Sequence, residues 1–313
     1  MSLDNQLLSE QIVELKRKKN AIILAHYYQQ PEIQDVADMV GDSLQMAQFA
    51  AKSQADILIV AGVYFMAETA KILNPARKVL LPDLMAGCSL ADSCEAKELS
   101  AFRAQYPDSP VVTYINCSAE VKAMSDIICT SSNALKVIES ITSNAPIIFA
   151  PDVNLGKYLM QQTGREMILW DGSCMVHENF SLDKIFELHK LYPKAKFIAH
   201  PESQAPILRI ASYIGSTKGM IDFVKEDSAE EFIIATEAGI LHQMRKEVPH
   251  KTLIPAPAYE ENSCSCSECP YMKMNTLEKL HACLLHESPE VQVEEGIRIQ
   301  AQRALSRMLA LSN

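Results

Sequence analysis

Short apolar runs alternate with amphipathic segments along most of the chain. The apolar runs suit strands buried on both faces of a sheet, and they span 21–25, 56–61, 78–81, 110–115, 126–129, 146–150, 166–170, 195–199, 231–235 and 251–254. Helical spacing of apolar residues predicts helices over 4–19, 44–52, 64–73, 95–105, 118–124, 133–141, 154–163, 182–192, 206–211, 217–226, 237–247, 275–287 and 292–311. Such alternation predicts an α/β fold with parallel sheets and right-handed crossovers.

The same order of strand, polar strand end and helix start occurs three times. When His26, Tyr114 and His200 are aligned, each is followed 17 residues later by a hydroxyl residue, and the copies start 88 and then 86 residues apart. The three hydroxyl residues are Ser43, Ser131 and Thr217. A fixed period of this size indicates a repeated supersecondary unit, and this unit is long enough to form a small domain.

The repeat divides the chain into three small domains rather than the two that its length suggests. We predict three-layer αβα repeats at 1–88, 89–174 and 175–274, with the helices of 275–313 joining the first repeat. No low-complexity linker separates the repeats, so we expect them to pack tightly together.

Polar side chains follow the carboxyl ends of the predicted strands, where ligands bind in parallel α/β sheets. They are His26, Tyr28, Tyr114, Asn116, His200 and Glu202, and similar positions are occupied by Cys88, Cys174 and the cysteines of 264–269. If the three repeats meet with these strand ends facing inward, the side chains converge on one central cavity.

Composition and charge narrow the range of functions. The chain has 313 residues, of which 48% are hydrophobic and 22% charged, and its net charge is −10. This charge argues against nonspecific binding to nucleic acid or to an anionic membrane. The sequence contains no secretory signal and no run of about 18 apolar residues, so we expect a soluble cytoplasmic protein. In that setting the nine cysteines suit metal ligands or buried thiols better than disulfides.

Three cysteine positions follow the repeat. Cys88 and Cys174 are 86 residues apart, and the third repeat has Cys264, Cys266 and Cys269 at the equivalent place. One thiolate from each repeat would give an iron–sulfur cluster three ligands and leave one iron open as a Lewis acid. The alternatives are buried thiols and a zinc ion in the 264–269 loop, where the four ligands of a structural site are lacking. Ordinary buried thiols are expected at Cys94, Cys117, Cys129 and Cys283.

Hydroxyl residues stand where helices are predicted to begin, at Ser43, Ser131, Ser216 and Thr217. Helix capping is the ordinary role of such residues. Helix N-termini also offer free N–H groups and the positive end of the helix dipole, which bind carboxylate or phosphate. Three such ends facing one cavity would suit substrates with three anionic groups in total, such as a dicarboxylate and a phosphate ester.

The candidate acid–base residues lie at the same strand ends. His26 and His200 occupy equivalent positions in two repeats, which favours a role in the site. Glu202 is a candidate general base whose pKa we expect burial to raise. Tyr28 and Tyr114 could donate protons or hydrogen bonds to a carbonyl oxygen. Surface or helix positions are expected for His177, His189, His242 and His250.

Eight segments are specific when they are taken together: AHYYQQPEIQDVADMVGDS (25–43), MAGCSLADSC (85–94), TYINCSAEVKA (113–123), DGSCMVHE (171–178), AHPE (199–202), GST (215–217), ATEAGILH (235–242) and CSCSECPYMKMN (264–275). Over essentially its full length the chain resembles the quinolinate synthase (NadA) family. The resemblance implies three stacked αβα domains with pseudo-threefold symmetry around a [4Fe-4S] cluster held by three cysteines. It also implies condensation of iminoaspartate with dihydroxyacetone phosphate to quinolinate, phosphate and water in NAD biosynthesis.

The resemblance also assigns residues. Cys88, Cys174 and Cys269 match the family's cluster ligands, and Cys269 is favoured in the last loop because Pro-Tyr-Met-Lys-Met-Asn follows it. This chain has CxCxxC where some members have CxxCxxC, and a reversible disulfide between Cys264 and Cys266 is left open. The family's substrate pocket matches His26, Tyr28, Ser43, Tyr114, Asn116, Ser131, His200, Glu202, Ser216 and Thr217.

The mechanism we expect from this assignment uses the open iron as a Lewis acid. Tyr28, His200 and Glu202 are the expected catalytic residues, and Tyr28 and Glu202 shuttle protons during isomerisation and ring closure. The helix N-termini hold the anionic groups of the substrates.

Two other functions fit part of this pattern. A noncatalytic iron–sulfur or zinc protein would bind metal without needing His26, Tyr28 and Glu202 at strand ends. Another cluster-dependent hydro-lyase would need one substrate and not three anion pockets. The sequence leaves open whether the protein is a monomer or a homodimer. It also leaves open direct contact with L-aspartate oxidase, which supplies iminoaspartate, a compound unstable in water.

Overall fold

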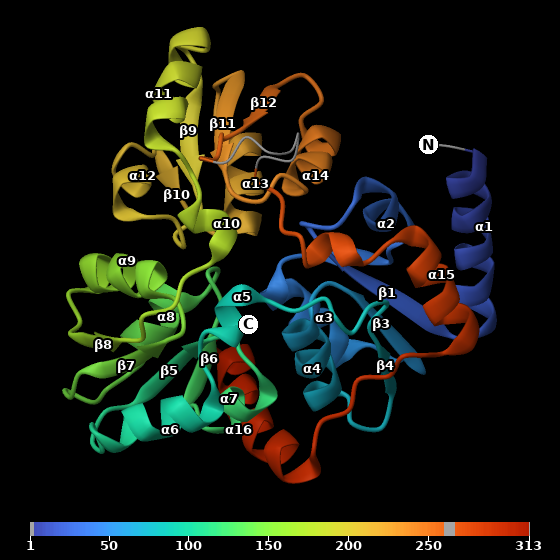
Figure 1. The fold of residues 1–313 in the computed structure, drawn as a ribbon, viewed down its shortest axis with the longest axis horizontal. Helices are drawn as coiled ribbons and strands as arrows, with labels where there is room; N and C mark the ends of the chain where they lie inside the picture. The colour runs from blue at the N-terminus through green and yellow to red at the C-terminus, as the bar shows by residue number, and fades with distance from the viewer. Residues whose placement is uncertain (1–2, 260–266, 313) are drawn as a thin grey trace.

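Three separate sheets, each covered by its own helices, make up the fold of this computed structural model, which describes residues 3–259 and 267–312 (Figure 1). Each sheet has four parallel strands, and the strand orders are β2-β1-β3-β4, β6-β5-β7-β8 and β10-β9-β11-β12. The predicted α/β class with small parallel sheets is confirmed, and the chain builds the same sheet topology three times.

The first sheet is formed near the N-terminus. Its strands are β1 (Ala21–His26), β2 (Met39–Gly41), β3 (Ile57–Ala61) and β4 (Lys78–Leu80). Its helices are α1 (Leu3–Lys18), α2 (Pro31–Val36), α3 (Ser43–Lys52) and α4 (Tyr64–Leu73), and the one-turn α5 (Ser89–Asp92) follows. All five residues of β3 are buried, because helices cover both faces of the sheet.

The second sheet comes from the middle of the chain. Its strands are β5 (Val111–Tyr114), β6 (Ile127–Cys129), β7 (Ile147–Ala150) and β8 (Met167–Leu169). Its helices are α6 (Ala96–Ala104), α7 (Ala119–Ala123), α8 (Ala134–Glu139) and α9 (Val153–Thr163), followed by the one-turn α10 (Met175–Glu178).

The third sheet repeats the pattern. Its strands are β9 (Lys196–Ala199), β10 (Tyr213–Ile214), β11 (Glu231–Ala235) and β12 (Thr252–Pro255). Its helices are α11 (Leu182–Leu191), α12 (Ala205–Arg209), α13 (Thr217–Glu226) and α14 (Ile240–Glu247).

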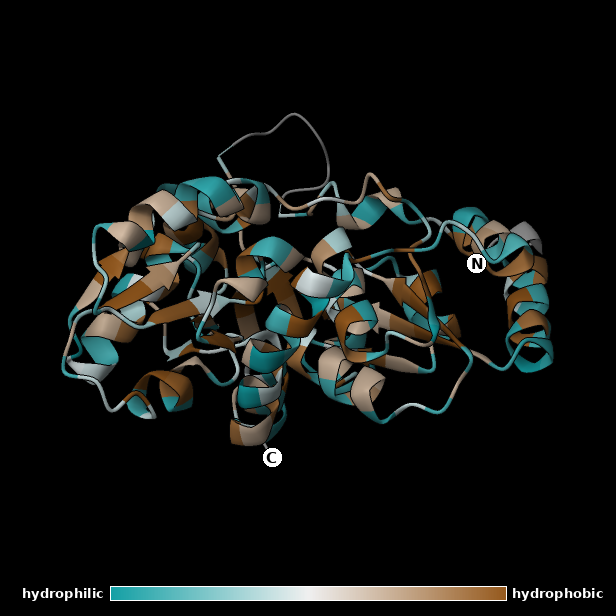
Figure 2. Ribbon diagram, turned by 90° about the horizontal axis from the view of Figure 1, so that it is seen from below, coloured by the Kyte–Doolittle hydropathy of each residue, from teal (hydrophilic) through white to brown (hydrophobic). Residues whose placement is uncertain are grey.

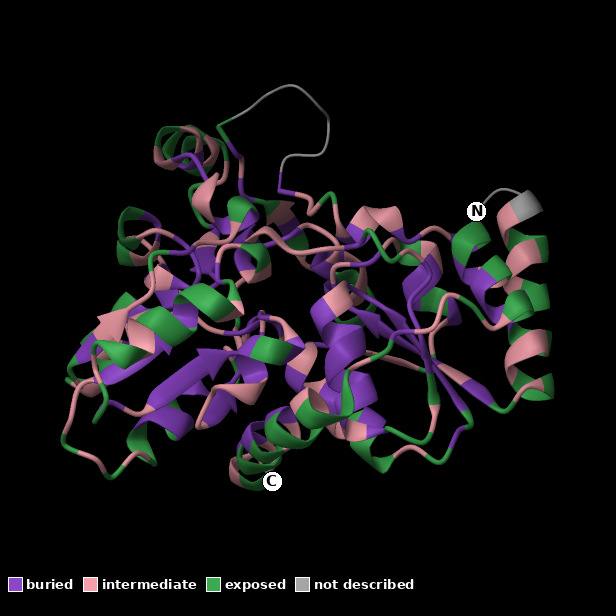
Figure 3. Cartoon of the chain, turned by 60° about the horizontal axis from the view of Figure 1, so that its bottom comes forward, coloured by how far each residue is buried: buried purple, intermediate pink, exposed green. Residues whose placement is uncertain are grey.

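The strands consist mostly of apolar residues, as the hydropathy colouring shows (Figure 2), and their buried side chains form clusters with those of the covering helices. The strands are the most thoroughly buried elements (Figure 3). Because the strands run parallel, as β1 and β3 do from the pair Ala21–Ile57 to the pair Ala25–Ala61, their carboxyl ends lie at one edge of each sheet. That edge is where the polar residues identified in the sequence stand.

The C-terminal segment contributes η1 (Met272–Met274), α15 (Leu277–His286) and α16 (Glu295–Leu311). Leu280 and Leu284 of α15 share an apolar cluster with Ile12 of α1. The α16 helix packs against α7 and β6 of the second unit and also contacts α4 of the first. It therefore holds these two units together. No helix in the described part of the chain has both the length and the apolarity to cross a membrane.

Among the short elements that the structure adds to those predicted from the sequence are β2, β10, α5, α10 and η1. Each has between two and four residues, which is too short for a recognisable period of apolar positions. The one-turn helices α5 and α10 start directly after Cys88 and Cys174, so two of the missed elements belong to the central site.

Candidate active site

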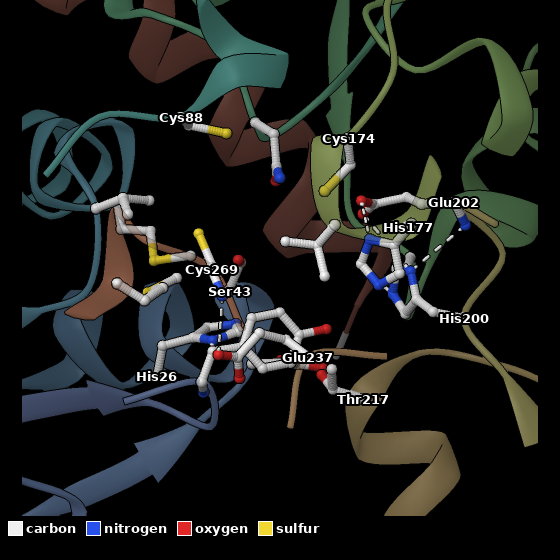
Figure 4. Close-up of a pocket in the computed structure, with 18 of the residues that line it drawn as sticks. His26, Ser43, Cys88, Cys174, His177, His200, Glu202, Thr217, Glu237 and Cys269 are labelled. Carbon is white, nitrogen blue, oxygen red and sulfur yellow. Dashed lines mark hydrogen bonds and ion pairs between the residues drawn. The ribbon is translucent and has the colours of Figure 1, made fainter. Parts of the chain in front are cut away.

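A cavity lies where residues from all three units meet at the carboxyl ends of their strands (Figure 4). Twelve of the residues singled out in the sequence line it: His26, Tyr28, Ser43, Cys88, Tyr114, Asn116, Ser131, Cys174, His200, Glu202, Thr217 and Cys269. Ser216 is not among the lining residues. Its hydroxyl accepts a hydrogen bond from the Gly219 N–H and caps α13.

Three cysteines, one from each unit, line this cavity as free thiols (Figure 4). Burial raises the pKa of Cys88 to about 12 and shifts those of Cys174 and Cys269 in the same direction. These thiols therefore need a bound cation or cluster to ionise at neutral pH. Three convergent sulfur donors fit an iron–sulfur cluster, because thiolates are its usual ligands. Cys264 and Cys266 lie outside the described residues.

The cysteines that do not follow the repeat are buried in apolar surroundings. All four are free and almost fully inaccessible, as predicted, and they are Cys94, Cys117, Cys129 and Cys283. Burial raises the pKa of each thiol, so they behave as small hydrophobic side chains.

His26 and His200 are held in the same way by their own strand ends. The N–H of Tyr28 donates to Nδ1 of His26 (3.2 Å), and the N–H of Glu202 donates to Nδ1 of His200 (3.4 Å). Burial lowers the pKa of both imidazoles to about 3, so both rings are neutral at pH 7. Since Nδ1 accepts, the proton sits on Nε2. Nε2 of His200 lies 3.1 Å from Oγ of Ser131.

Glu202 is buried and uses both carboxylate oxygens. Oε2 lies 3.0 Å from Nδ1 of His177, and Oε1 accepts the Tyr114 hydroxyl at 2.5 Å. Burial acts to raise the pKa of Glu202, but the facing His177 and His200 rings and the Tyr114 hydroxyl lower it to about 2. The expected rise in pKa was therefore wrong, because it counted burial and not these partners. Glu202 is therefore an ionised carboxylate at neutral pH.

Tyr28 is connected to Glu202 through a chain of side chains. The Tyr28 hydroxyl lies 2.6 Å from Oγ1 of Thr236, which lies 3.0 Å from Nε2 of His177. The other ring nitrogen of His177 faces Glu202. Burial and the charge of Glu202 raise the pKa of Tyr28, so it is a neutral phenol. A hydroxyl, an imidazole and a carboxylate in this order can move a proton between Tyr28 and Glu202.

His177 lies on a helix, as one of its two expected settings allowed, but not at the surface. The side chain is 2% exposed and lines the cavity, because α10 turns it inward three residues after Cys174. Potential ligand atoms of Cys174, His177 and Glu202 all lie within 4.8 Å of one another. The sequence did offer a signal that His177 belongs to the site, because His177 follows Cys174 by three residues, which is about one helical turn. Thr236 gave no comparable signal.

Two of the predicted helix N-termini reach the cavity. Ser43 is the first residue of α3, whose cap is Asp42, and Thr217 is the first residue of α13. Ser131 lies in a turn, and α8 begins only at Ala134. The prediction of a helix start at Ser131 was therefore wrong, because the turn of 131–133 separates it from the helix.

Asn116 lines the cavity between these groups. Its Oδ1 is buried and has no hydrogen-bond partner among the described residues. Buried side-chain oxygens almost always have a partner, so this atom is available to a bound molecule.

A buried ion pair fixes the segment that carries Cys269. Glu237 is fully buried, lies 2.8 Å from Nζ of Lys273 and accepts the N–H of Cys269 at 3.1 Å. Lys273 also donates to the carbonyl oxygen of Tyr28 at 2.8 Å. The pair thus connects the third cysteine to the strand end of the first unit. Sequence reasoning missed both residues, although they lie within the segments 235–242 and 264–275.

Comparisons of the sequence with known proteins identify its family. The family model described as "Quinolinate synthetase A protein" (NadA) matches residues 10–310. The chain is 59% identical to the quinolinate synthase of Trichormus variabilis, over 96% of this chain and 93% of that protein. It is 60% identical to the enzyme of Gloeothece citriformis over the same shares, and 58% identical to that of Microcystis aeruginosa over 96% and 94%. The chain therefore belongs to the NadA family of quinolinate synthases.

Proposed function

We propose that this protein condenses iminoaspartate with dihydroxyacetone phosphate to form quinolinate, phosphate and water in NAD biosynthesis. The carrying observation is that strand-end residues and one cysteine from each of three units line one cavity, in a chain that matches named quinolinate synthases over 96% of its length. A noncatalytic metal protein would not require the ordered acid–base groups beside the cysteines.

Cys88, Cys174 and Cys269 would hold a [4Fe-4S] cluster, which when bound supplies an open iron that acts as a Lewis acid. The thiols that line the cavity support this assignment. Three free thiols from three units line the cavity, and no fourth cysteine is among the described residues that line it.

The chain's own residues would bind the anionic groups of the substrates. Ser43 and Thr217 each begin a ten-residue helix, and the N-terminal end of a helix favours carboxylate or phosphate. The neutral rings of His26 and His200 carry their protons on Nε2 and can donate to further oxygens. The free Oδ1 of Asn116 accepts a hydrogen bond from an amine or hydroxyl.

Tyr28 and Glu202 would carry out the proton transfers. Tyr28 is a neutral phenol and can give a proton to a developing oxyanion, while Glu202 is a carboxylate and can take one from carbon or nitrogen. Thr236 and His177 connect the two groups, so the proton lost by Tyr28 can be replaced from within the site. His200 orients the substrate beside Glu202.

We further propose that the three domains span 1–88, 89–174 and 175–274 and that the protein acts in the cytoplasm as a monomer or a homodimer. A transient contact with L-aspartate oxidase would shorten the time that unstable iminoaspartate spends in water.

The test is an anaerobic count of iron and sulfide in the wild type and in Cys88→Ser, Cys174→Ser and Cys269→Ser, with quinolinate formation measured on the same samples. We expect about four iron and four sulfide per chain, lost in each variant together with activity. Cys283→Ser is the matched control, because Cys283 is buried far along the chain in an apolar cluster. A cluster that survives both Cys88→Ser and Cys174→Ser would contradict the proposal.

A further inference from the structure

A second cleft lies between α9 of the second unit and the segment of 203–214 in the third, and its volume is about 270 Å³. Its charged lining residues are Lys157 and Arg209, and no carboxylate is among the described residues that line it. Glu178, which lies close by, is already bound by the side-chain amides of Asn154 and Gln204. In a chain with a net charge of −10, a cleft with cationic charges alone favours anions.

The floor of this cleft carries an unsatisfied donor. Ser203 is fully buried, lines the cleft, and its Oγ has no hydrogen-bond partner in the described structure. Leaving a buried hydroxyl without a partner costs free energy, so this hydroxyl would gain from a hydrogen bond to a group bound in the cleft. Tyr158, Gln161 and Gln162 add polar groups to the walls.

We propose that this cleft binds the phosphate or carboxylate group of a small anionic molecule. Lys157 and Arg209 neutralise the oxyanion, and the Ser203 hydroxyl donates a hydrogen bond to it. Arginine suits both groups because its planar fork of N–H donors matches two oxygens at once. The Nε of Arg209 is bound to the Ala205 carbonyl, which orients the guanidinium without using its terminal nitrogens.

The position of the cleft places its ligand next to the segment that carries the proposed base. Ser203 follows Glu202 directly in the chain, and Lys157 belongs to a different unit from Arg209. An anion bound here bridges the second and third units beside the proposed base. The site is separate from the reaction cavity, which His26, Ser43 and Thr217 line.

Titration calorimetry of the anaerobic, cluster-loaded protein tests the site, with inorganic phosphate and, separately, succinate as probes. The test variant is Lys157→Gln/Arg209→Gln. The matched control is Lys52→Gln/Lys97→Gln, which removes the same charge from exposed positions elsewhere. Anion binding in the reaction cavity is common to all three proteins, so the site is the binding step that only the test variant loses. The probe with the larger affinity identifies phosphate or carboxylate as the ligand group.

We expect the test variant to bind the probe at least roughly tenfold more weakly, since each charged group contributes a strong hydrogen bond, while the control matches the wild type. Ser203→Ala should weaken binding severalfold without lowering the unfolding temperature, because the hydroxyl it removes has no partner to lose. Equal binding by the test variant, equal loss in the control, or no second binding step in the wild type would overturn the site. Quinolinate formation, measured separately, tests the proposed reaction and does not depend on this result.

Discussion

The strand ends of the first and third units carry the same histidine on the same backbone arrangement but differ in the residue two positions later. In both units the N–H of that later residue donates to Nδ1 of the histidine. The residue is Tyr28 in one unit and Glu202 in the other. Burial keeps Tyr28 a neutral phenol, whereas the facing His177 ring helps to keep Glu202 ionised. A repeated scaffold thus supplies two equal hydrogen-bond donors, and one difference between the copies supplies the proposed acid and the proposed base.

The second unit has diverged further. Tyr114 takes the position of the histidine, and its hydroxyl donates to Glu202 of the third unit. Through this hydrogen bond the second unit contacts the proposed acid–base pair, whose two members come from the other two units. The comparison indicates that the three copies keep their backbone geometry while they divide the chemical tasks, which four substitutions can test.

The largest effect is expected from the base. Glu202→Gln should lower kcat by about 10³-fold, because the amide cannot accept the proton that a general base removes. Iron and sulfide content should stay at the wild-type level, since Glu202 is not a proposed cluster ligand. Steady-state quinolinate formation measures the loss, with Glu120→Gln, an exposed position, as the control. Full activity in Glu202→Gln would remove this residue from the base role.

The acid of the first unit should have the next largest effect. Tyr28→Phe removes the phenolic proton and should lower kcat by roughly 10²-fold. The neighbouring Tyr27 provides the control, because its hydroxyl bonds to Gln45 and the residue does not line the cavity. If Tyr27→Phe loses as much activity as Tyr28→Phe, the effect comes from packing and not from proton transfer.

The histidines that the two strand ends share should control stability in acid. Their pKa of about 3 in the folded chain lies below the unfolded value of about 6.5. The unfolded chain therefore binds more protons between these values, and stability falls as the pH drops from 7 toward 3. At pH 5 each of these histidines should lower the free energy of unfolding by up to about 2 kcal/mol.

Guanidinium midpoints measured between pH 7.5 and pH 5 test this loss. His200→Asn should flatten the fall, because the variant has one less group to protonate. The exposed His250→Asn should keep the wild-type slope. An unchanged slope in His200→Asn would contradict the assignment of a neutral buried ring.

The smallest effect is expected from the link between the acid and the base. Thr236→Val keeps the shape but breaks the connection between Tyr28 and His177, and should lower kcat by roughly tenfold. Thr236→Ser retains the hydroxyl and should restore most of the activity. A serine variant as slow as the valine variant would show that the methyl group, and not the hydroxyl, matters. Measuring kcat as a function of pH distinguishes a lost proton transfer, which should change the pH profile, from lost packing, which should not.

The sequence alone determined most of the strands and helices, the threefold repeat and most of the residues that line the cavity. These features are local, since a strand reveals itself by its apolar run and a residue such as His26, Tyr114 or His200 by its place at the carboxyl end of one. The fixed period then aligned Cys88 with Cys174, although it could not say which cysteine of 264–269 joins them.

The tertiary structure alone decided how these residues act on one another. Thr236 lies 208 residues from Tyr28, and 59 residues separate it from His177, so no local pattern could reveal that the three form one chain. The same holds for the pKa of Glu202, which burial alone would raise and which partners from α10 and β5 lower instead. Electrostatic interactions depend on distance in space, and only the packing of the three units against one another sets those distances.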